Sequence, residues 1–588
     1  QLDMDVQALS RQPIVDRALQ GSIEAPLRLE ANYKLAQGAS SIDLSRLSAN
    51  LLYADKQPRI SLQADSNVRV RTNLSSRQSE LGRARGKVTL TVANLTPEPF
   101  AGILAARGLA FNDANGKAVL SSDGKSLTID TIEPFKVTGS VLKAGDKQAL
   151  QSFTLIADSE TVMQGDTLHA KLKQFNIAFD KDKGKPALDA DVDVILKGSG
   201  ENTWVENLTA NIKMLLPALL DQPAILPGHG LTAGELTSVT TLDSSGKLDS
   251  TTRVQGLKSG DPLPLELLEI KVGGQLNDNG TFDLSMPIST RGKSGESDLQ
   301  IKAVHTRKQG EHNDLTASVD SSVFYLNDIL NTVKAIANEE ARKEAEAELS
   351  EEQRAAIAAK KQADDMRADD RAFWDVIPYN RRVVYNIQRL FYTDYLEIVE
   401  ITGRAEATAG RLSLDQFKAQ FHDSPIALNS VMTFTPGEKP YDLEMQASVD
   451  RFDLATFLRE LDPESTPMAE GLFDVNIDAY GNSPNMAQYR NNLYFDMKMH
   501  SRDGVFRLLD PNDPLVTGSS NFAGAVGEGV SYIPTGLFGL GAVARLVNYI
   551  KEVPYDKIEA HMVRGESRDV QIKKYVVQSP DVLMTAKG

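Results

Sequence analysis

The feature that most constrains this chain is a strict alternation of apolar and polar residues, which recurs along much of its length. In residues 188–194, leucine, alanine and valine alternate with three aspartates. A period of two places the apolar side chains on one face of a β-strand and the polar side chains on the other. Strands with one apolar and one wet face are typical of antiparallel sheets. The chain is therefore predicted to be mainly β.

The same alternation continues in the C-terminal third, in residues 412–415 and 426–434. The apolar positions of these runs are the candidate ligand-contacting residues, since they share one face. They are Leu188, Ala190, Val192, Val194, Leu412, Leu414, Ile426, Leu428, Met432 and Phe434. The polar residues between them are expected to face solvent, and they include Asp189, Asp191, Asp193, Ser413 and Asp415.

One-sided strands in such number need something over their apolar face. A sandwich supplies a second sheet and a barrel closes on itself, but here the strand runs follow one another in series with little helix between them. We therefore expect a long curled antiparallel sheet that forms an elongated hydrophobic groove. An apolar groove in a water-exposed protein marks a ligand site, and the ligand that matches it is an alkyl chain.

A longer repeat lies over the alternation. Five segments each combine an alternating run, a few polar or proline residues and a short helical turn that ends in leucine. They are residues 2–19, 88–104, 205–220, 315–330 and 443–458. The repeat predicts modules of sheet, each ending in a short helix laid across the strands.

Residues 311–377 contain neither glycine nor proline and are rich in alanine, glutamate, lysine and arginine. An apolar stripe at helical spacing ends near Ala337, so the rest is predicted to be a solvated helical hairpin inserted between modules, or an arm that binds a partner. The expected organisation is repeated β modules in residues 1–330, a charged helical insert in 331–377 and a β region in 378–588. An amphipathic helix is expected near residues 538–550.

Composition excludes several classes of function. The chain has no cysteine, which removes thiol catalysis, disulfides and iron–sulfur ligation. Its formal net charge of −16 argues against a nucleic-acid partner. The seven histidines lack the spacing of a metal site, and neighbours such as His422, Asp423 and Ser424 cannot converge as a triad. We therefore expect no enzyme, no metal and no cofactor.

The C-terminal third also carries a sequence resemblance. Residues 396–403 form a strand that ends in glycine, 410–420 contain the pattern G-x-L-x-L, and 449–454 lead into a helical turn. Further matching segments follow in the same order, at residues 471–481, 491–504, 558–562 and 570–582. Across residues 381–588 this order resembles the C-terminal region of AsmA-like proteins, a family of bacterial envelope proteins related to bridge-like lipid-transfer proteins.

The resemblance implies a periplasmic protein, anchored in the inner membrane by an N-terminal helix that is absent from this chain. It implies a non-catalytic carrier whose hydrophobic groove passes phospholipid acyl chains between the inner and outer membranes. The implied partners are phospholipids or other acyl lipids, the inner-membrane anchor and an outer-membrane partner. The alternative is a non-catalytic scaffold for envelope assembly that supports outer-membrane biogenesis. In it, the chain's own helices fill the apolar face and the long insert docks a partner.

Overall fold

The computed structural model describes most of the chain. The described residues are 2–6, 23, 25–37, 41–65, 68–73, 78–100, 109–142, 148–180, 185–198, 203–222, 225–226, 228–277, 280–307, 313–337, 359, 362–363, 365–376, 379–461, 469–506, 553–565, 569–580 and 583–587. By its internal contacts the chain divides into two units. Unit 1 comprises Gln1–Leu276 with Thr332–Glu344, and unit 2 comprises Asn277–Asn331 with Ala345–Gly588.

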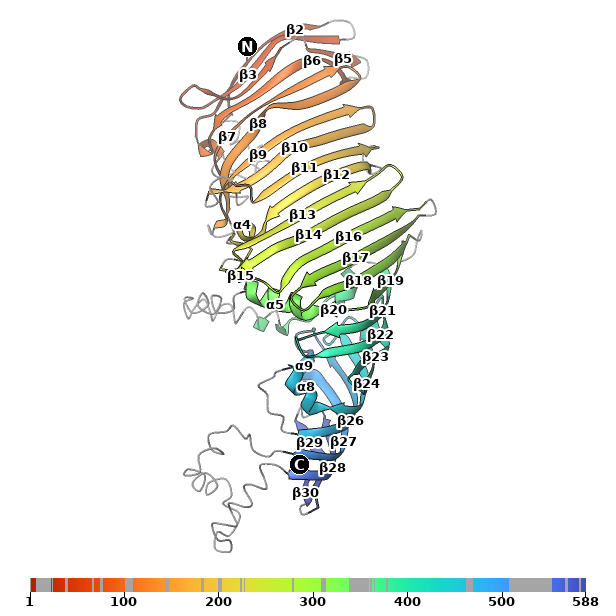
Figure 1. The fold of residues 1–588 in the computed structure, drawn as a ribbon. Helices are drawn as coiled ribbons and strands as arrows, with labels where there is room; N and C mark the ends of the chain where they lie inside the picture. Colours follow the sequence, from red (N-terminus) through yellow and green to blue (C-terminus); the bar gives the residue numbers. More distant parts are fainter. Residues whose placement is uncertain are drawn as a thin grey trace. The chain divides into compact units, whose positions relative to one another are not determined.

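Unit 1 is built of strands that follow one another in chain order (Figure 1). They are β1 (Leu2–Asp5), β2 (Arg28–Gln37), β3 (Ser41–Leu52), β4 (Pro58–Ala64), β5 (Val68–Asn73), β6 (Gln78–Leu95), β7 (Leu109–Asp123), β8 (Ser126–Leu142), β9 (Gln148–Gln164), β10 (Thr167–Phe179), β11 (Leu188–Lys197), β12 (Trp204–Leu215), β13 (Ala233–Leu242), β14 (Lys247–Ser259), β15 (Asp261–Pro262) and β16 (Leu265–Leu276).

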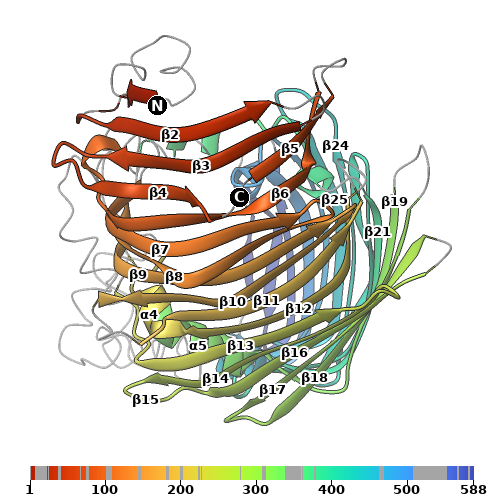
Figure 2. The ribbon, with the colours of Figure 1, turned by 90° about the horizontal axis from the view of Figure 1, so that it is seen from above.

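The pairing within unit 1 is antiparallel throughout. Each of the strands β6 to β14 pairs with the one that follows it, and β14 also pairs with β16. At the N-terminal end, β1 pairs with β2, and β3 pairs with β2, β4 and β5. Figure 2 shows these strands bending along their length, so the sheet of unit 1 is curved.

Unit 2 is also built of strands that follow one another in chain order. They are β17 (Thr281–Gly292), β18 (Glu296–Thr306), β19 (Asn313–Ser321), β20 (Phe324–Tyr325), β21 (Tyr379–Phe391), β22 (Glu397–Thr408), β23 (Arg411–Phe421), β24 (Ser424–Phe434), β25 (Tyr441–Asp453), β26 (Ala469–Ser483), β27 (Leu493–Phe506), β28 (Val553–Arg564), β29 (Val570–Gln578) and β30 (Leu583–Ala586).

One place in unit 2 departs from antiparallel pairing. Strands β19 and β20 both pair with β21 in parallel. Two parallel neighbours require a crossover connection of a dozen or more residues, and the chain between Tyr325 and Tyr379 supplies it. The charged insert predicted from the sequence therefore lies within this crossover.

Three strands contain a bulge held by a side chain from the next strand. At each bulge a non-glycine residue has a positive φ, and the pairing register shifts beside it. The backbone N–H of that residue donates to an amide or carboxylate oxygen on the neighbouring strand, so it is not left without a partner. The pairs are Asn94 with Asn115 (2.7 Å), Gln416 with Asn429 (2.7 Å) and Arg451 with Asp474 (2.9 Å). Bulges bend a strand and increase its twist, so they contribute to the curvature of each sheet.

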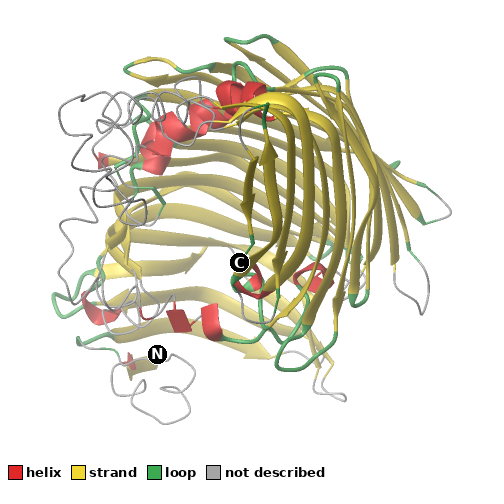
Figure 3. Ribbon diagram, turned by 90° about the horizontal axis from the view of Figure 1, so that it is seen from below, coloured by secondary structure: helices red, strands yellow, loops and turns green. Residues whose placement is uncertain are grey.

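The helices are short, and Figure 3 shows them beside the ends of the strands. They are η1 (Glu98–Phe100), α4 (Leu216–Leu220), α5 (Leu326–Ala337), η4 (Phe373–Val376), α8 (Leu454–Leu461) and α9 (Tyr489–Asn492). Helix α4 follows β12 and α8 follows β25, as the repeat predicted. The predicted helical turn within residues 2–19 lies largely outside the described residues.

The predicted mainly β fold is confirmed, because antiparallel strands dominate both units. Of the predicted insert at 331–377, the structure describes the second half of α5 and residues 359, 362–363 and 365–376, whereas 338–358 lie outside the described residues. The amphipathic helix expected near 538–550 also lies outside them.

Candidate functional site

The pairing register of unit 1 places apolar side chains of neighbouring strands side by side on one face. Leu188 of β11 lies opposite Ile177 of β10 and Met214 of β12. The row continues through Leu236 of β13 and Val254 of β14. Directly paired residues in a sheet share a face, so these strands present one continuous apolar surface. We call it the apolar face of unit 1.

All four residues predicted in unit 1 lie on this face. Val192 pairs with Leu172 and Ala210, and Val194 pairs with Ala170 and Leu208. Leu188, Ala190, Val192 and Val194 are each partly exposed rather than buried. Apolar side chains at the centre of this sheet thus keep surface that is accessible to a ligand.

The opposite face of the same strands is polar and carries polar contacts between neighbouring strands. His169 Nε2 lies 2.6 Å from Asp193 Oδ1, and Lys213 Nζ lies 2.8 Å from Glu235 Oε2. Asn211 also donates to Asp191 at 2.8 Å. Exposed pairs of this kind add little stability, but they make the face compatible with water.

One strand end of the apolar face of unit 1 is covered. Helix α4 packs there, and its Ala218 joins Phe179 and Ala187 in a buried cluster. Further along this end, the backbone N–H of buried Leu265 donates to the hydroxyl of Thr332, in the second half of α5, at 2.9 Å. This strand end is therefore a small closed core.

The other strand end of unit 1 is open among the described residues. Leu127, Met163 and Leu168 lie side by side across β8, β9 and β10. Leu127 is 37% exposed and Met163 is 47% exposed. The apolar surface therefore continues to the margin of the sheet, where it meets solvent.

Unit 2 has an apolar face of the same kind. Leu428 of β24 pairs with Ala447, and the row continues through Ile477 and Met497 to Met562 of β28. All five are partly exposed. The centre of this face thus resembles the centre of the face in unit 1.

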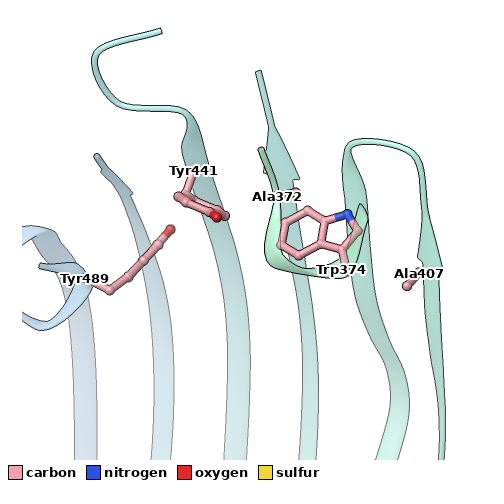
Figure 4. Packing of buried hydrophobic residues seen from close by; sticks show 5 residues of the cluster. All are labelled: Ala372, Trp374, Ala407, Tyr441 and Tyr489. Carbon is pink, nitrogen blue, oxygen red and sulfur yellow. The ribbon is translucent and has the colours of Figure 1, made fainter. Parts of the chain in front are cut away.

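The six residues predicted in unit 2 share this face, but they do not share one environment. Leu412, Met432 and Phe434 pack against a buried cluster at one strand end. The cluster consists of Ala372, Trp374, Ala407, Tyr441 and Tyr489, and Figure 4 shows its side chains near the ends of the strands. Leu414, Ile426 and Leu428 are not packed against it and are partly exposed.

Residues 365–376, which we call the tryptophan segment, bring Trp374 onto this strand end. The Trp374 ring meets Tyr441 and Phe434 edge-on, with centroids 5.9 and 6.5 Å apart. Trp374 is 3% exposed, and its indole Nε1 has no hydrogen-bond partner among the described residues. The ring therefore contributes through packing.

The backbone of the tryptophan segment is fixed by polar groups of unit 2. The Asn485 amide donates to the carbonyl oxygens of Asp365 (2.6 Å) and Arg367 (2.7 Å). The Arg381 guanidinium donates to the carbonyl oxygen of Trp374 at 2.5 Å. Burial, with the Asp369 carboxylate nearby, raises the pKa of Tyr441 to about 12. The segment is a fixed part of unit 2.

The opposite strand end of unit 2 is closed by α8. Phe421 packs against Phe452 and Phe457, with centroids 5.8 and 5.5 Å apart. The hydroxyl of Thr393 donates to the carbonyl oxygen of Glu460 at 2.8 Å, which ties a loop to this helix. Unit 2 is therefore covered at both strand ends, with partly exposed residues between them.

One polar residue departs from the sequence expectation. Ser413 lies on the polar face, opposite Glu406 and Val431, but it is only 1% exposed. Its hydroxyl donates to Asp415 Oδ2 at 3.1 Å. The expectation that Ser413 faces solvent is wrong, because a side chain this small is covered by its longer neighbours.

Other polar groups that the sequence singled out have structural partners. His422 Nε2 lies 2.8 Å from Glu460 Oε1, and the Ser424 hydroxyl donates to the carbonyl oxygen of Arg451 at 2.8 Å. A hollow of about 540 Å³ lies on the polar face of unit 2, lined by residues such as Thr402, Lys418 and Gln420. Its lining also includes Ala419, Pro425, Ile426 and Ala427, so polar and apolar groups are mixed there.

Two features of the apolar faces are not among the site residues predicted from the sequence. The first is the tryptophan segment, whose signal was a pair of large aromatic residues, Phe373 and Trp374, at the end of a highly charged stretch. The second is a group of hydroxyl side chains on β13 and β14, described below. Their signal was serine and threonine at positions where the alternation calls for apolar residues.

Within the described ranges, no three histidine, aspartate or glutamate side chains gather as metal ligands would. Nor does any helix in that part of the chain combine the length and apolar character required to cross a membrane. Comparison with protein-family models, curated proteins and solved structures found no match to this chain.

Proposed function

We propose that this protein carries phospholipids by their acyl chains, between the inner and outer membranes of a bacterial envelope. The apolar face of each unit acts as a hydrophobic groove, and the phospholipid headgroups stay in water. The protein acts as a carrier and performs no catalytic step. Its proposed place is the periplasm, in keeping with the resemblance of residues 381–588 to AsmA-like proteins.

The observation that carries this proposal is the unbroken succession of partly exposed apolar residues across neighbouring strands. Five consecutive strands of unit 1 contribute one residue each to the row from Ile177 to Val254. Each methylene removed from water contributes about 0.8 kcal/mol, so an acyl chain that follows such a row is held along its length. Polar residues on the opposite face keep the other side in water.

The row of apolar residues also suits movement of an acyl chain from strand to strand. A row of similar side chains offers no single deep pocket, so the binding free energy changes little as a chain shifts by one strand. Neighbouring strands lie about 4.8 Å apart, a distance that spans roughly four methylene groups of an extended chain. This smooth surface favours transport over tight storage.

A second candidate function is an envelope scaffold whose own segments fill the apolar face. The observation that favours it is the packing of Trp374 over Leu412, Met432 and Phe434 in unit 2. In that case the partly exposed residues are the margin of an ordinary core, and no lipid is bound.

The test is native mass spectrometry of the full chain, purified with mild detergent, together with extraction and identification of its lipids. The carrier proposal expects phospholipid on the wild-type protein and its loss in the double variant Val192→Asp, Val194→Asp. The matched control is Thr237→Asp, Val239→Asp, which places two charges at the same spacing on the polar face. It should keep the lipid.

Thermal stability is measured on the same samples. A variant that loses lipid but keeps its melting temperature supports the carrier. Wild-type protein free of lipid, or a variant that unfolds, contradicts it and favours the scaffold.

A further inference from the structure

A group of four neighbouring hydroxyl side chains on β13 and β14 interrupts the apolar face of unit 1. Ser238 and Thr240 lie on β13, directly opposite Thr252 and Ser250 on β14. They occupy the same face as Val192, because Val192 pairs with Ala210 and Ala210 pairs with Thr240. We call these four residues the hydroxyl island.

The hydroxyl island is surrounded by apolar residues on every side. Along the two strands it is bounded by the pairs Leu236 with Val254 and Leu242 with Leu248. On the flanking strands its paired neighbours are Ala210, Ile212, Ile270 and Val272. The island is thus a polar patch within an otherwise apolar surface, and all four side chains are partly exposed.

The hydroxyls bond to each other across the two strands. Ser238 Oγ lies 2.9 Å from Thr252 Oγ1, and Thr240 Oγ1 lies 2.8 Å from Ser250 Oγ. Each pair has two O–H groups and uses one of them in this bond. The second O–H of each pair has no acceptor in the described part of the chain, so the island keeps two donors for a ligand.

Another hydroxyl pair on the same face behaves differently. Thr131 Oγ1 lies 3.3 Å from Ser159 Oγ, and it also accepts the backbone N–H of Ser159 at 3.2 Å. The register of β8 and β9 shifts beside these residues. Thr131 therefore supports an irregular backbone, whereas the strands at the hydroxyl island are regular and do not need such support.

We propose that the hydroxyl island binds the two ester carbonyl groups of a diacyl phospholipid. This inference rests on the proposed function and specifies the lipid class that the groove takes. Ester carbonyls accept hydrogen bonds and donate none, so two of them match two spare O–H groups. The island measures about 4.8 Å between strands and about 7 Å along them, which is the scale of two esters on adjacent glycerol carbons.

An acyl chain alone is a poor ligand for this patch. Covering a hydroxyl with methylene groups and giving it no partner leaves its lost hydration uncompensated, which lowers affinity. Valine or alanine in place of these threonines and serines would avoid that loss of affinity, because each has a similar shape and no hydroxyl. The hydroxyl island is therefore a station for the ester region of the lipid, with the acyl chains lying on the apolar residues around it.

The test compares two phospholipids that differ only at the glycerol linkage. The full chain is stripped of lipid and offered a diester phosphatidylethanolamine and its diether analogue with the same chains, and native mass spectrometry measures the competition. Two additional hydrogen bonds give the diester an expected preference of about tenfold.

The quadruple variant Ser238→Ala, Thr240→Val, Ser250→Ala, Thr252→Val should reduce this preference to less than twofold, while the diether lipid still binds. The control Thr237→Val, Thr241→Val, Thr251→Val removes hydroxyls from the polar face of the same strands. It should keep the full preference.

Equal binding of both lipids by the wild-type protein overturns the inference and leaves the carrier proposal intact. A preference that survives in the quadruple variant also overturns it. If the wild-type protein binds neither lipid, the proposed function fails together with the inference. The wild-type comparison does not depend on whether the quadruple variant folds.

Discussion

In unit 1 the apolar face is closed at one strand end, whereas in unit 2 packed segments close it at both. The covered end of unit 1 is small, with one buried ring, Phe179, beside Ala187 and Ala218. The covered ends of unit 2 are aromatic, with Trp374 at one and Phe421 at the other. Away from these covered ends, both faces consist mainly of partly exposed apolar residues.

The difference teaches that alternation and enclosure are separate properties. The same period of two builds both faces, but large rings arriving from outside the alternating runs decide how much of each face is covered. Unit 2 should therefore respond to changes on its apolar face as a core does. Unit 1 should respond as a surface does.

The largest expected effect comes from placing charge on each face. Leu428→Asp with Met432→Asp should destabilise unit 2 by more than about 4 kcal/mol, since Met432 packs against the buried cluster. The double variant Val192→Asp, Val194→Asp should cost less than about 1 kcal/mol. Differential scanning calorimetry measures both. If both double variants lose the same amount of stability, the apolar faces of the two units do not differ in how strongly they are covered.

Removing the central ring of the cluster should have the next largest effect. Trp374→Ala should destabilise unit 2 by about 3–4 kcal/mol, because it empties a buried site. The chain has two tryptophans, and Trp204 of unit 1 is 56% exposed. Fluorescence in a Trp204→Phe background therefore reports on Trp374 alone.

With Trp374 as the only tryptophan, the emission should be blue-shifted and should shift red as unit 2 unfolds in urea. In the Trp374→Ala variant, the emission of Trp204 reports on unit 1. Its urea midpoint should equal that of unit 1 in the wild-type protein. A lower urea midpoint in the Trp204 emission would show instead that the buried cluster around Trp374 also stabilises unit 1.

Loosening the tryptophan segment should have a smaller effect. Asn485→Ala removes two hydrogen bonds to the backbone of that segment and should cost about 2 kcal/mol, because the carbonyl oxygen of Arg367 loses its donor and that of Asp365 keeps only the Gln488 amide. Asn482→Ala is the matched control, since Asn482 is exposed. Urea denaturation should separate the two variants, and equal midpoints refute the anchoring role.

The smallest effect is a dependence on alkaline pH. The pKa of Tyr441 is raised to about 12 in the folded protein, mainly by burial, against about 10 when unfolded. A raised pKa means that the folded state holds the proton more tightly, so this contribution is complete below pH 10 and is lost as pH rises to 12.

The free energy of unfolding of the wild-type protein should accordingly fall by on the order of 1–2 kcal/mol more than that of Tyr441→Phe over this interval. The comparison with Tyr441→Phe removes the contribution of other tyrosines. Parallel pH profiles for the two proteins contradict the assignment.

Much of the fold follows from local pattern. The alternation in residues 188–194 and 426–434 predicted both strands and the face on which their apolar residues lie, since the side-chain period of a strand depends only on its backbone. The helices after β12 and β25 were also predicted, because leucines at helical spacing follow each strand.

What could not be predicted depends on segments far apart in the chain. Nothing near Tyr379 indicates that β21 runs parallel to β19, because that pairing is made across the whole crossover. The burial of Leu412 likewise depends on Trp374, which lies 38 residues earlier in the sequence. The positive φ of Gln416 depends on the Asn429 side chain of the next strand.

The order of pairing has a consequence for how such a chain is made. From β6 to β14, each strand pairs with the one before it, so the contacts that build the sheet are short in sequence. During synthesis a new strand finds its partner already in place and adds to the growing edge, with little loop-closure entropy to overcome. Because each strand pairs only with its neighbours, a sheet of this kind can lengthen by one hairpin at a time. An inserted hairpin disturbs only the two strands beside it.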